Sequence, residues 1–363
     1  MERRKFLLLF PQRRCTYGNA CARLLEKDFN INYIVIVILF LLITNVFEAS
    51  AQYGDIRVHD PVIIKQDSTY YIFCTGRGIS IKRSKDIYNW EDIGRVFQTP
   101  PEWAIKAVSG FKGHIWAPDI FYANDTYYLY YSISSFGKNT SCIGVATNKT
   151  LHPDDPNYQW VDHGKVIESV PNRDNWNAID PNIIRDENGE FWMTFGSFWS
   201  GIKLVKLAPD LLKIQTEPQE WYSLASRPRS PGIAGVEAGD GAIEAPFIIR
   251  KNGYYYLFVS FDYCCRGARS NYKIMVGRST KVMGPYVDLQ GKSMLDGGGT
   301  LVLAGDKRWP GQGHNSVLLD EKGDWLVHHA YDAENGGKSA LIIRQLHWDE
   351  DGWPIAGEPI ASQ

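Results

Sequence analysis

Five stretches of this sequence repeat one order of polar and apolar residues. Each begins with a short polar motif, continues through an apolar run and a turn, and reaches a segment rich in aromatic residues. In one copy the motif at 177–182 leads through Ile183 and Ile184 and a turn at 186–189 to the aromatic segment 191–195. Short runs with alternating polarity and many β-branched or aromatic residues predict β-strands.

The five copies are spaced almost evenly along the chain. Their polar anchors are Asp60, Asp119, Asp180, Glu244 and His314, which follow one another at intervals of 59, 61, 64 and 70 residues. A near-fixed period of this length has room for about four strands per unit. The sequence therefore predicts an all-β chain folded as a five-bladed β-propeller.

Further strand-like segments follow each aromatic segment. Second segments occur at 78–84, 142–147, 201–206, 273–279 and 340–344, and third segments at 90–92, 158–162 and 284–287. No segment keeps a 3.6-residue apolar period, so we expect little helix. The stretch 217–240 shows no clear strand and is expected to be the longest irregular loop, of the kind that borders binding sites.

The first 51 residues differ in character from the rest. Basic residues at positions 3–5, 13 and 14 precede an apolar run over 34–43, and Ala49-Ser50-Ala51 has the small-x-small pattern of a cleavage site. We expect a signal peptide over 1–51, a single propeller domain over 52–363, and a secreted or periplasmic protein. The apolar run is shorter than a membrane span of about 20 residues. No stable membrane contact is therefore expected after cleavage, and an uncleaved anchor is the alternative.

Charge and cysteine content narrow the functional class. The 39 basic and 41 acidic residues nearly balance, which gives no basic face for nucleic acid. The four cysteines after residue 51 are too few for a disulfide scaffold. Among them, Cys264 and Cys265 form either a vicinal disulfide or two thiols. The 12 Trp and 20 Tyr either pack between blades or stack on sugar rings.

The repeated anchors point to acid–base chemistry. The innermost strand of each blade lines the propeller axis, so the anchors should converge there. One Asp-Pro dipeptide is an ordinary turn, but carboxylates clustered at an axis repel one another. That repulsion raises at least one pKa and separates an acid from a base, as glycosidic hydrolysis requires.

Five motifs in order resemble glycoside hydrolase family 43, and within it the endo-1,5-α-L-arabinanases. They lie at 59–61, 116–119, 178–182, 243–246 and 313–316, and the segments 134–137, 196–203 and 261–267 support the arabinanase branch. The resemblance covers the chain from about residue 55 onward. It implies a five-bladed propeller and an inverting, endo-acting hydrolase of α-1,5-linked arabinan and arabino-oligosaccharides, which we expect to be a monomer.

The resemblance also implies roles for individual residues. Asp60 matches the general base, Glu244 the general acid, and Asp180 the third carboxylate that tunes the acid. His314 matches a residue that helps to hold calcium, largely through water, although calcium prefers oxygen ligands. Asp119 is expected to be structural and to pack beside Trp116, and a contact with sugar is the alternative. The expected substrate contacts are Trp116, Phe136, Asn177, Ile179, Ser197, Phe198 and Trp199.

Two other functions fit the same pattern. An exo-acting α-L-arabinofuranosidase or β-xylosidase would use the same propeller, often with an extra C-terminal β-sandwich. The sequence runs only a few residues past Trp353-Pro354, so we expect no such domain. A non-catalytic sugar-binding propeller is the third candidate, and the presence of Asp60, Asp180 and Glu244 together argues against it.

Overall fold

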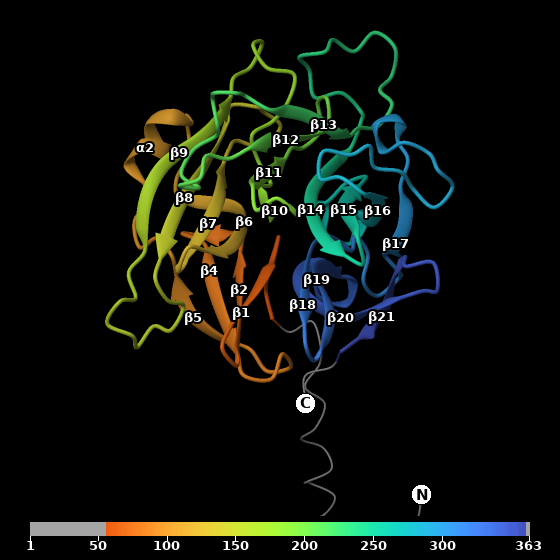
Figure 1. Ribbon diagram of the computed structural model, residues 1–363. Helices are drawn as coiled ribbons and strands as arrows, with labels where there is room; N and C mark the ends of the chain where they lie inside the picture. Colours follow the sequence, from red (N-terminus) through yellow and green to blue (C-terminus); the bar gives the residue numbers. More distant parts are fainter. Residues whose placement is uncertain (1–55, 361–363) are drawn as a thin grey trace, which may run out of the picture. The chain divides into compact units, whose positions relative to one another are not determined.

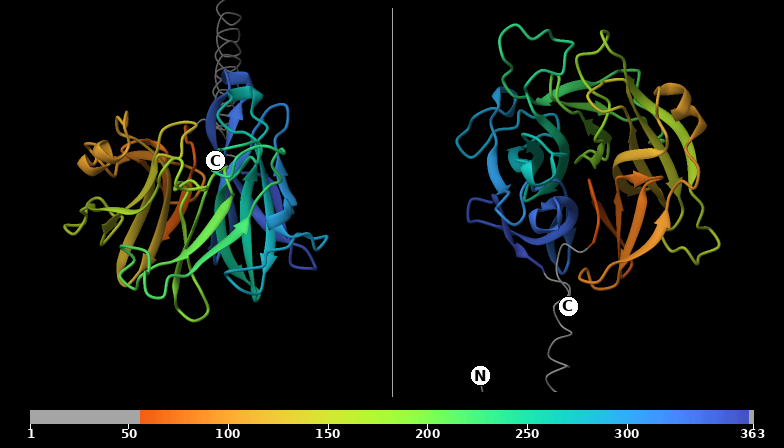
Figure 2. Two further views of the ribbon diagram at one scale, coloured as in Figure 1. Left: turned by 90° about the horizontal axis from the view of Figure 1, so that it is seen from above. Right: turned by 180° about the vertical axis from the view of Figure 1, so that it is seen from behind.

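A computed structural model describes residues 56–360, which fall within one compact unit, Gln52–Gln363. Five antiparallel sheets stand around a common axis (Figure 1, Figure 2), so the chain is a five-bladed β-propeller, as predicted. The predicted signal peptide at 1–51 lies outside the described residues. Within 56–360, no helix has the length and apolar character needed to cross a membrane.

Each blade is built from four strands that pair in chain order. Blade 1 contains β1 (Val62–Gln66), β2 (Thr69–Cys74), β4 (Ser80–Ser84) and β5 (Glu91–Arg95). Blade 2 contains β6 (His114–Ala123), β7 (Thr126–Ile133), β8 (Ser141–Asn148) and β9 (Val161–Ser169), with the short β3 (Gly76–Arg77) paired to β6. Blade 3 contains β10 (Asn182–Arg185), β11 (Phe191–Phe195), β12 (Ile202–Lys206) and β13 (Trp221–Ala225).

The last two blades follow the same plan. Blade 4 contains β14 (Ile243–Lys251), β15 (Tyr254–Phe261), β16 (Lys273–Ser279) and β17 (Thr300–Ala304). Blade 5 contains β18 (Gly313–Asp320), β19 (Gly323–Asp332), β20 (Lys338–Trp348) and β21 (Pro354–Pro359). The described helices are α2 (Glu102–Ala107) and the 3₁₀ turns η1 (Gly267–Arg269), η2 (Met294–Asp296) and η3 (Ala333–Asn335). Helix is therefore minor, as expected.

Two predictions about strands were wrong. The stretch 217–240 contains β13, whose Leu224 and Ala225 are buried in the core between blades 3 and 4. The segment 284–287 is not a blade strand, because β17 already occupies the edge of β16 from Lys273 to Val276. Val287 makes only isolated bridges, to Arg278 and Ser293.

Aromatic side chains from the second strands fill the spaces between blades. Tyr71 and Leu129 pack together between blades 1 and 2, and Tyr130 and Phe195 between blades 2 and 3, all with essentially no exposed surface. Burial of one large apolar side chain stabilises the fold by roughly 1.5–3 kcal/mol. Much of the aromatic content therefore stabilises the ring.

The innermost strand of every blade has a residue of positive φ within its first four residues or just before it. These residues are Asp60, Ala117, Asp180, Ala245 and His314, with φ between 39° and 58°. Non-glycine residues seldom adopt this conformation, and proline follows it in four of the five blades. Three of the predicted anchors are therefore equivalent, but two are not, because Glu244 lies one residue before its left-handed residue and Asp119 lies two residues after.

The backbone N–H of each left-handed residue donates to a side chain of the preceding blade, which ties the ring together. The five bonds are Ala117 N to Thr75 Oγ1 (2.7 Å), Asp180 N to Ser132 Oγ (3.0 Å), Ala245 N to Asp180 Oδ2 (3.1 Å), His314 N to Ser260 Oγ (2.9 Å) and Asp60 N to His329 Nδ1 (3.1 Å). In the other four blades this position has a side chain that accepts the bond, but in blade 3 it is Gly196. A Cβ there would lie 2.6 Å from the Gly201 oxygen. The Asp180 carboxylate supplies the acceptor instead.

A second set of bonds links neighbouring blades two residues further along. Asp119 Oδ2 accepts the Ile183 N–H at 2.8 Å, and Asn182 Oδ1 accepts the Ile248 N–H at 2.8 Å. Ser316 Oγ accepts the Ile63 N–H at 3.3 Å and so joins blades 5 and 1. Asp119 is structural, as expected, but its carboxylate acts as a link to blade 3.

Candidate active site

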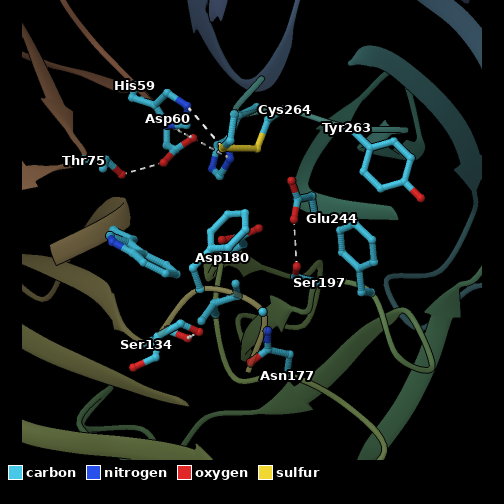
Figure 3. A pocket seen from close by; sticks show the side chains of 18 of the residues that line it. His59, Asp60, Thr75, Ser134, Asn177, Asp180, Ser197, Glu244, Tyr263 and Cys264 are labelled. Atoms are coloured by element: carbon cyan, nitrogen blue, oxygen red, sulfur yellow. Dashed lines mark hydrogen bonds and ion pairs between the residues drawn. A yellow bond between two sulfur atoms is a disulfide. The ribbon is translucent and has the colours of Figure 1, made fainter. Parts of the chain in front are cut away.

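A cavity of about 920 Å³ lies at the propeller axis and is lined by residues of all five blades. Figure 3 shows Asp60, Asp180 and Glu244 around it, with the Cys264 sulfur on its wall. The structure brings together every residue for which the sequence predicted a role in the site. They are Asp60, Trp116, Phe136, Asn177, Ile179, Asp180, Ser197, Phe198, Trp199, Glu244 and His314.

Asp60 is buried and has charged or polar partners on both carboxylate oxygens. Its Oδ1 lies 2.8 Å from His59 Nδ1 and 3.0 Å from His314 Nδ1, and its Oδ2 accepts from Thr75 Oγ1 at 2.5 Å. Burial alone would raise the pKa of Asp60, but the charges and hydrogen bonds of the two histidines outweigh burial. The Asp60 pKa therefore lies well below its usual value, and the group is ionised at neutral pH.

His314 is the counterpart of Asp60. Burial alone would lower its pKa, but the Asp60 charge and hydrogen bond, followed by the charges of Asp180 and Glu244, raise the pKa to about 9. His329, behind it, accepts the Asp60 N–H on Nδ1, and burial holds its pKa well below the usual value. His314 is thus charged at neutral pH and His329 is neutral, because only His314 faces several carboxylates.

Glu244 lies on β14 with both carboxylate oxygens hydrogen-bonded. Ser197 Oγ donates to Oε2 at 2.7 Å, and Tyr272 Oη donates to Oε1 at 2.7 Å. Glu244 is less buried than Asp60 or Asp180. Two fixed donors and partial exposure orient this carboxyl toward the cavity, where a bound molecule can reach it.

Asp180 and Glu244 form an electrostatically coupled pair. Burial, followed by the charges of Glu244 and Asp60 against an opposing effect of His314, raises the pKa of Asp180 to about 8. Asp180 Oδ2 accepts the N–H of Ala245, the residue after Glu244, which holds the two carboxyls in one place. Asp180 therefore keeps its proton at neutral pH.

The predicted substrate contacts differ in exposure. Phe136 stands at the rim with 81% of its surface exposed, and Trp116 is half-buried, with its Nε1 donating to His114 Nδ1 at 2.9 Å. Asn177, Ile179 and Ser197 lie buried at the floor. Trp199 is 7% exposed and donates from Nε1 to the Val236 carbonyl at 3.0 Å, so it also holds the loop beside the cavity.

Several residues of the site had no predicted role. Tyr272 and Thr75 orient Glu244 and Asp60, and His329 receives the Asp60 N–H. His59 also had no predicted role, although it lies beside Asp60 in the motif 59–61. That position was the only sequence signal that could have placed any of these four residues in the site. The other three come from the ends of distant strands and have no distinctive local pattern.

The surroundings of His314 suit a water-ligated cation. A small cavity of about 10 Å³ on the axis is lined by residues of all five blades, among them Asp180, His314 and Asn315. Asn315 is buried, and neither its Oδ1 nor its Nδ2 has a hydrogen-bond partner among the described residues. The cavity holds roughly one water. The Asn315 oxygen, and the His314 imidazole once it has lost its proton, are the ligands that the chain would offer to a cation, and the nearby carboxylates supply the charge.

The ionised Asp60 and the protonated Asp180 beside Glu244 separate a base from an acid, which equips this propeller as an acid–base hydrolase. Residues 54–354 match the model for Glycosyl hydrolases family 43, and the chain belongs to that family. It is 53% identical over 303 residues to Extracellular exo-alpha-(1->5)-L-arabinofuranosidase ArbA of Cellvibrio japonicus (strain Ueda107), covering 84% of this chain and 87% of that protein.

Two further comparisons also find arabinan-degrading enzymes. Extracellular endo-alpha-(1->5)-L-arabinanase 1 of Bacillus subtilis (strain 168) is 44% identical over 301 residues, covering 82% of this chain and 87% of that protein. The structure of Cellvibrio cellulosa alpha-L-arabinanase complexed with arabinohexaose is 52% identical and superimposes with a TM-score of 0.81, covering 83% of this chain and 95% of that one.

Proposed function

We propose that this chain is an extracellular hydrolase that cleaves α-1,5-L-arabinofuranosidic bonds in arabinan, in endo mode and with inversion. The observation that carries the proposal is the placement of an ionised Asp60 in one cavity with Glu244 and with Asp180, whose pKa is raised. The extracellular arabinan-degrading relatives support the substrate and the location. The resemblance to endo-arabinanases in the segments 134–137 and 196–203 supports the endo mode.

Each carboxyl has a distinct part in the proposed reaction. Asp60, ionised by its two histidines, removes a proton from the attacking water. Glu244, which faces the cavity, delivers a proton to the leaving oxygen. Asp180, which holds a proton up to about pH 8, keeps that acid supplied and positioned. Inversion requires a base and an acid far enough apart to admit water, and Asp60 and Glu244 come from different blades, 1 and 4.

A calcium ion near His314 is part of the proposal and rests on the family resemblance. When bound, it would offset the mutual repulsion of the carboxylates. His314 and Asn315 would hold it, with water as the remaining ligands. The proton transfers described above depend only on residues of the chain.

The roles of the carboxyls are tested by Glu244→Gln and Asp60→Asn, each assayed on arabinan. Each variant should lose activity by roughly 10²–10⁴-fold, because each removes a proton-transfer group at nearly constant shape. Asp119→Asn is the matched control, since its carboxylate bonds to blade 3, and it should retain kcat. Activity near that of the wild type in either catalytic variant would refute the assignment. The anomeric form of the first product, followed by NMR, tests inversion.

An exo mode is the second candidate, because ArbA of Cellvibrio japonicus is described as an exo-arabinofuranosidase. Products released early from debranched linear arabinan distinguish the two modes. A ladder of mixed oligomers indicates endo attack, whereas a single short product indicates exo attack.

A further inference from the structure

Two adjacent cysteines form part of the wall of the axial cavity. Cys264 and Cys265 follow β15 and are joined by a disulfide. Both residues line the cavity, together with Asp60, Glu244 and His314. Figure 3 shows Cys264 with Asp60 and Glu244. Cys265 is exposed, and its Sγ lies 3.8 Å from His59 Nε2. No step of the proposed hydrolysis uses this disulfide.

The segment that carries the disulfide is held from several sides. Asp262 forms ion pairs with Arg227 (2.6 Å) and Lys273 (2.8 Å) just before it. The Cys265 N–H donates to Tyr331 Oη at 2.7 Å, and Tyr331 Oη lies 2.9 Å from His59 Nε2. A disulfide between adjacent residues also removes the rotamer freedom of both side chains. The sulfurs therefore form a wall that needs no ordering when a ligand arrives.

The chemistry of this wall suits the carbon face of a sugar. A disulfide has no hydrogen-bond donor and does not ionise, so it offers a polarisable and weakly hydrated surface. Hydroxyl groups of a pentose need polar partners, which Ser197, Asn177 and the carboxyls supply elsewhere in the cavity. The C–H face of the same ring needs an apolar surface on which to pack.

We infer that the Cys264–Cys265 disulfide is a substrate-binding wall, against which the C–H face of a pentose ring packs beside the cleaved bond. The inference rests on the proposed function. The disulfide is a specificity contact and takes no part in proton transfer. Reduction converts it to two mobile, polar thiols, one of them beside His59. Binding should then weaken while the acid–base groups stay in place.

The test is a comparison of KM and kcat on arabinohexaose before and after treatment of the purified protein with a phosphine reductant. Loss of one or two apolar contacts should raise KM roughly five- to tenfold with kcat nearly unchanged. Thiol counting verifies that the bond has opened, and reoxidation should restore KM. Cys264→Ala/Cys265→Ala should show the raised KM and no response to reductant.

Cys142→Ala is the matched control. Cys142 is a free, buried cysteine in blade 2, so this variant should keep the reductant response of the wild type. Melting curves of reduced and oxidised protein show whether the fold is retained. An unchanged KM after verified reduction would overturn the inference. A fall in kcat alone, together with a shifted pH profile, would also overturn it, because it would mean that the disulfide supports His59 rather than the substrate. A wild type that cleaves no arabinan would instead overturn the proposed function, and the inference with it.

Discussion

Asp60 and Asp180 are both buried carboxyl groups, yet their neighbours move their pKa values in opposite directions. Two histidines contact Asp60, so the cost of burying its charge is more than offset. Asp180 has the charges of Glu244 and Asp60 nearby, and its pKa rises to about 8. The identity of the neighbouring residue, rather than the depth of burial, decides which carboxyl is ionised.

This arrangement predicts the shape of the pH–rate profile. Asp60 should remain active as a base well below pH 4, because its pKa is low. Activity should fall as the pH rises through about 8, where Asp180 loses the proton that it can pass to Glu244. In Asp180→Asn this source of protons is gone, so the alkaline limb should move to lower pH. The measurement is kcat/KM against pH for both proteins, and an alkaline limb at the same pH in both would show that Asp180 does not tune the acid.

Calcium near His314 predicts a joint loss of activity and stability on chelation. An ion that binds only the folded chain stabilises it by mass action. Chelator should therefore lower both the melting temperature and arabinan hydrolysis, and calcium should restore both. Magnesium should restore them poorly, because it releases its waters reluctantly.

The control for this experiment is His314→Ala, which should resemble the chelated wild type and respond little to chelator. Metal analysis of the untreated protein completes the measurement. Metal-free protein with full activity would leave His314 solely as the charged partner of Asp60.

At the level of single residues, the sequence predicted which side chains meet but misjudged their equivalence. Asp119 and Glu244 were matched to Asp60 and Asp180, whereas the left-handed residues in those blades are Ala117 and Ala245. Side-chain direction at a blade entrance depends on backbone φ, which the residue type does not reveal. Tyr272 was missed because its contact with Glu244 depends on how β15 and β16 pair.

The inner strands are joined to neighbouring blades by side-chain hydrogen bonds. Asp119 links β6 to β10 from a fully buried position, and burial, partly offset by its hydrogen bonds from Ile183 and Asn182, raises its pKa to about 7. Between about pH 4 and 7 the folded chain holds a proton on Asp119 that the unfolded chain has lost. Stability from this group is therefore present below pH 4 and is lost as the pH rises through 7.

Asp119→Asn tests this dependence. At pH 5 the variant should be less stable than the wild type by about 1 kcal/mol, because a hydrogen bond is weakened. The deficit should shrink or reverse at pH 8, where the wild type carries a buried charge. Urea unfolding at both pH values measures the difference. A deficit that is equal at both would mean that Asp119 does not titrate in this range.

Ser132, at the end of β7, accepts the Asp180 N–H and has no exposed surface. Ser132→Ala should cost about 1–3 kcal/mol, because it leaves a buried N–H without its partner. Activity should also fall, since Asp180 loses its position. Denaturant unfolding and an arabinan assay measure the two effects, with the exposed Ser109→Ala as control. A stable variant with normal kcat would show that this bond is not needed.

The repeated polar-to-aromatic order predicted the blades because every inner pair of strands buries the same face. The exceptions were β13, β17 and β21, the outer strands of blades 3, 4 and 5. Outer strands pair on one side only and are partly exposed, as Trp221 and Leu301 are. Their hydrophobic pattern is weak for that reason, and long-range pairing decides where they form.

Within residues 56–360, the ring closes between blades 5 and 1 without a shared strand. Asp320 on β18 accepts from Lys65 Nζ at 2.6 Å and from Tyr70 Oη at 2.8 Å, and the Leu341 N–H donates to the Ile56 carbonyl at 2.8 Å. The same boundary separates Asp60 from His314 and His329. Closure of the ring and assembly of the site are therefore one event.

Asp320→Ala should expose this coupling. Two partly buried partners lose their acceptor, at a cost of about 1–3 kcal/mol, and the boundary between the blades should open before the rest melts. The midpoint temperature of inactivation should then lie below the midpoint temperature of the β-sheet circular dichroism signal, and the gap should be larger than in the wild type. Glu91→Ala removes an exposed ion pair within blade 1 and should change neither. Coincident curves for Asp320→Ala would contradict the coupling.

The bond from the Asp60 N–H to His329 has a consequence for the timing of synthesis. A ribosome makes Asp60 early, but His314 and His329, which set its charge and position, emerge more than 250 residues later. Until then Asp60, the proposed general base, has only His59 and Thr75 beside it. A nascent chain arrested before β18 would carry all three carboxyls in order and still cleave no arabinan. Hydrolytic activity would thus appear in a single step with the last blade, which makes it a direct measure of complete synthesis.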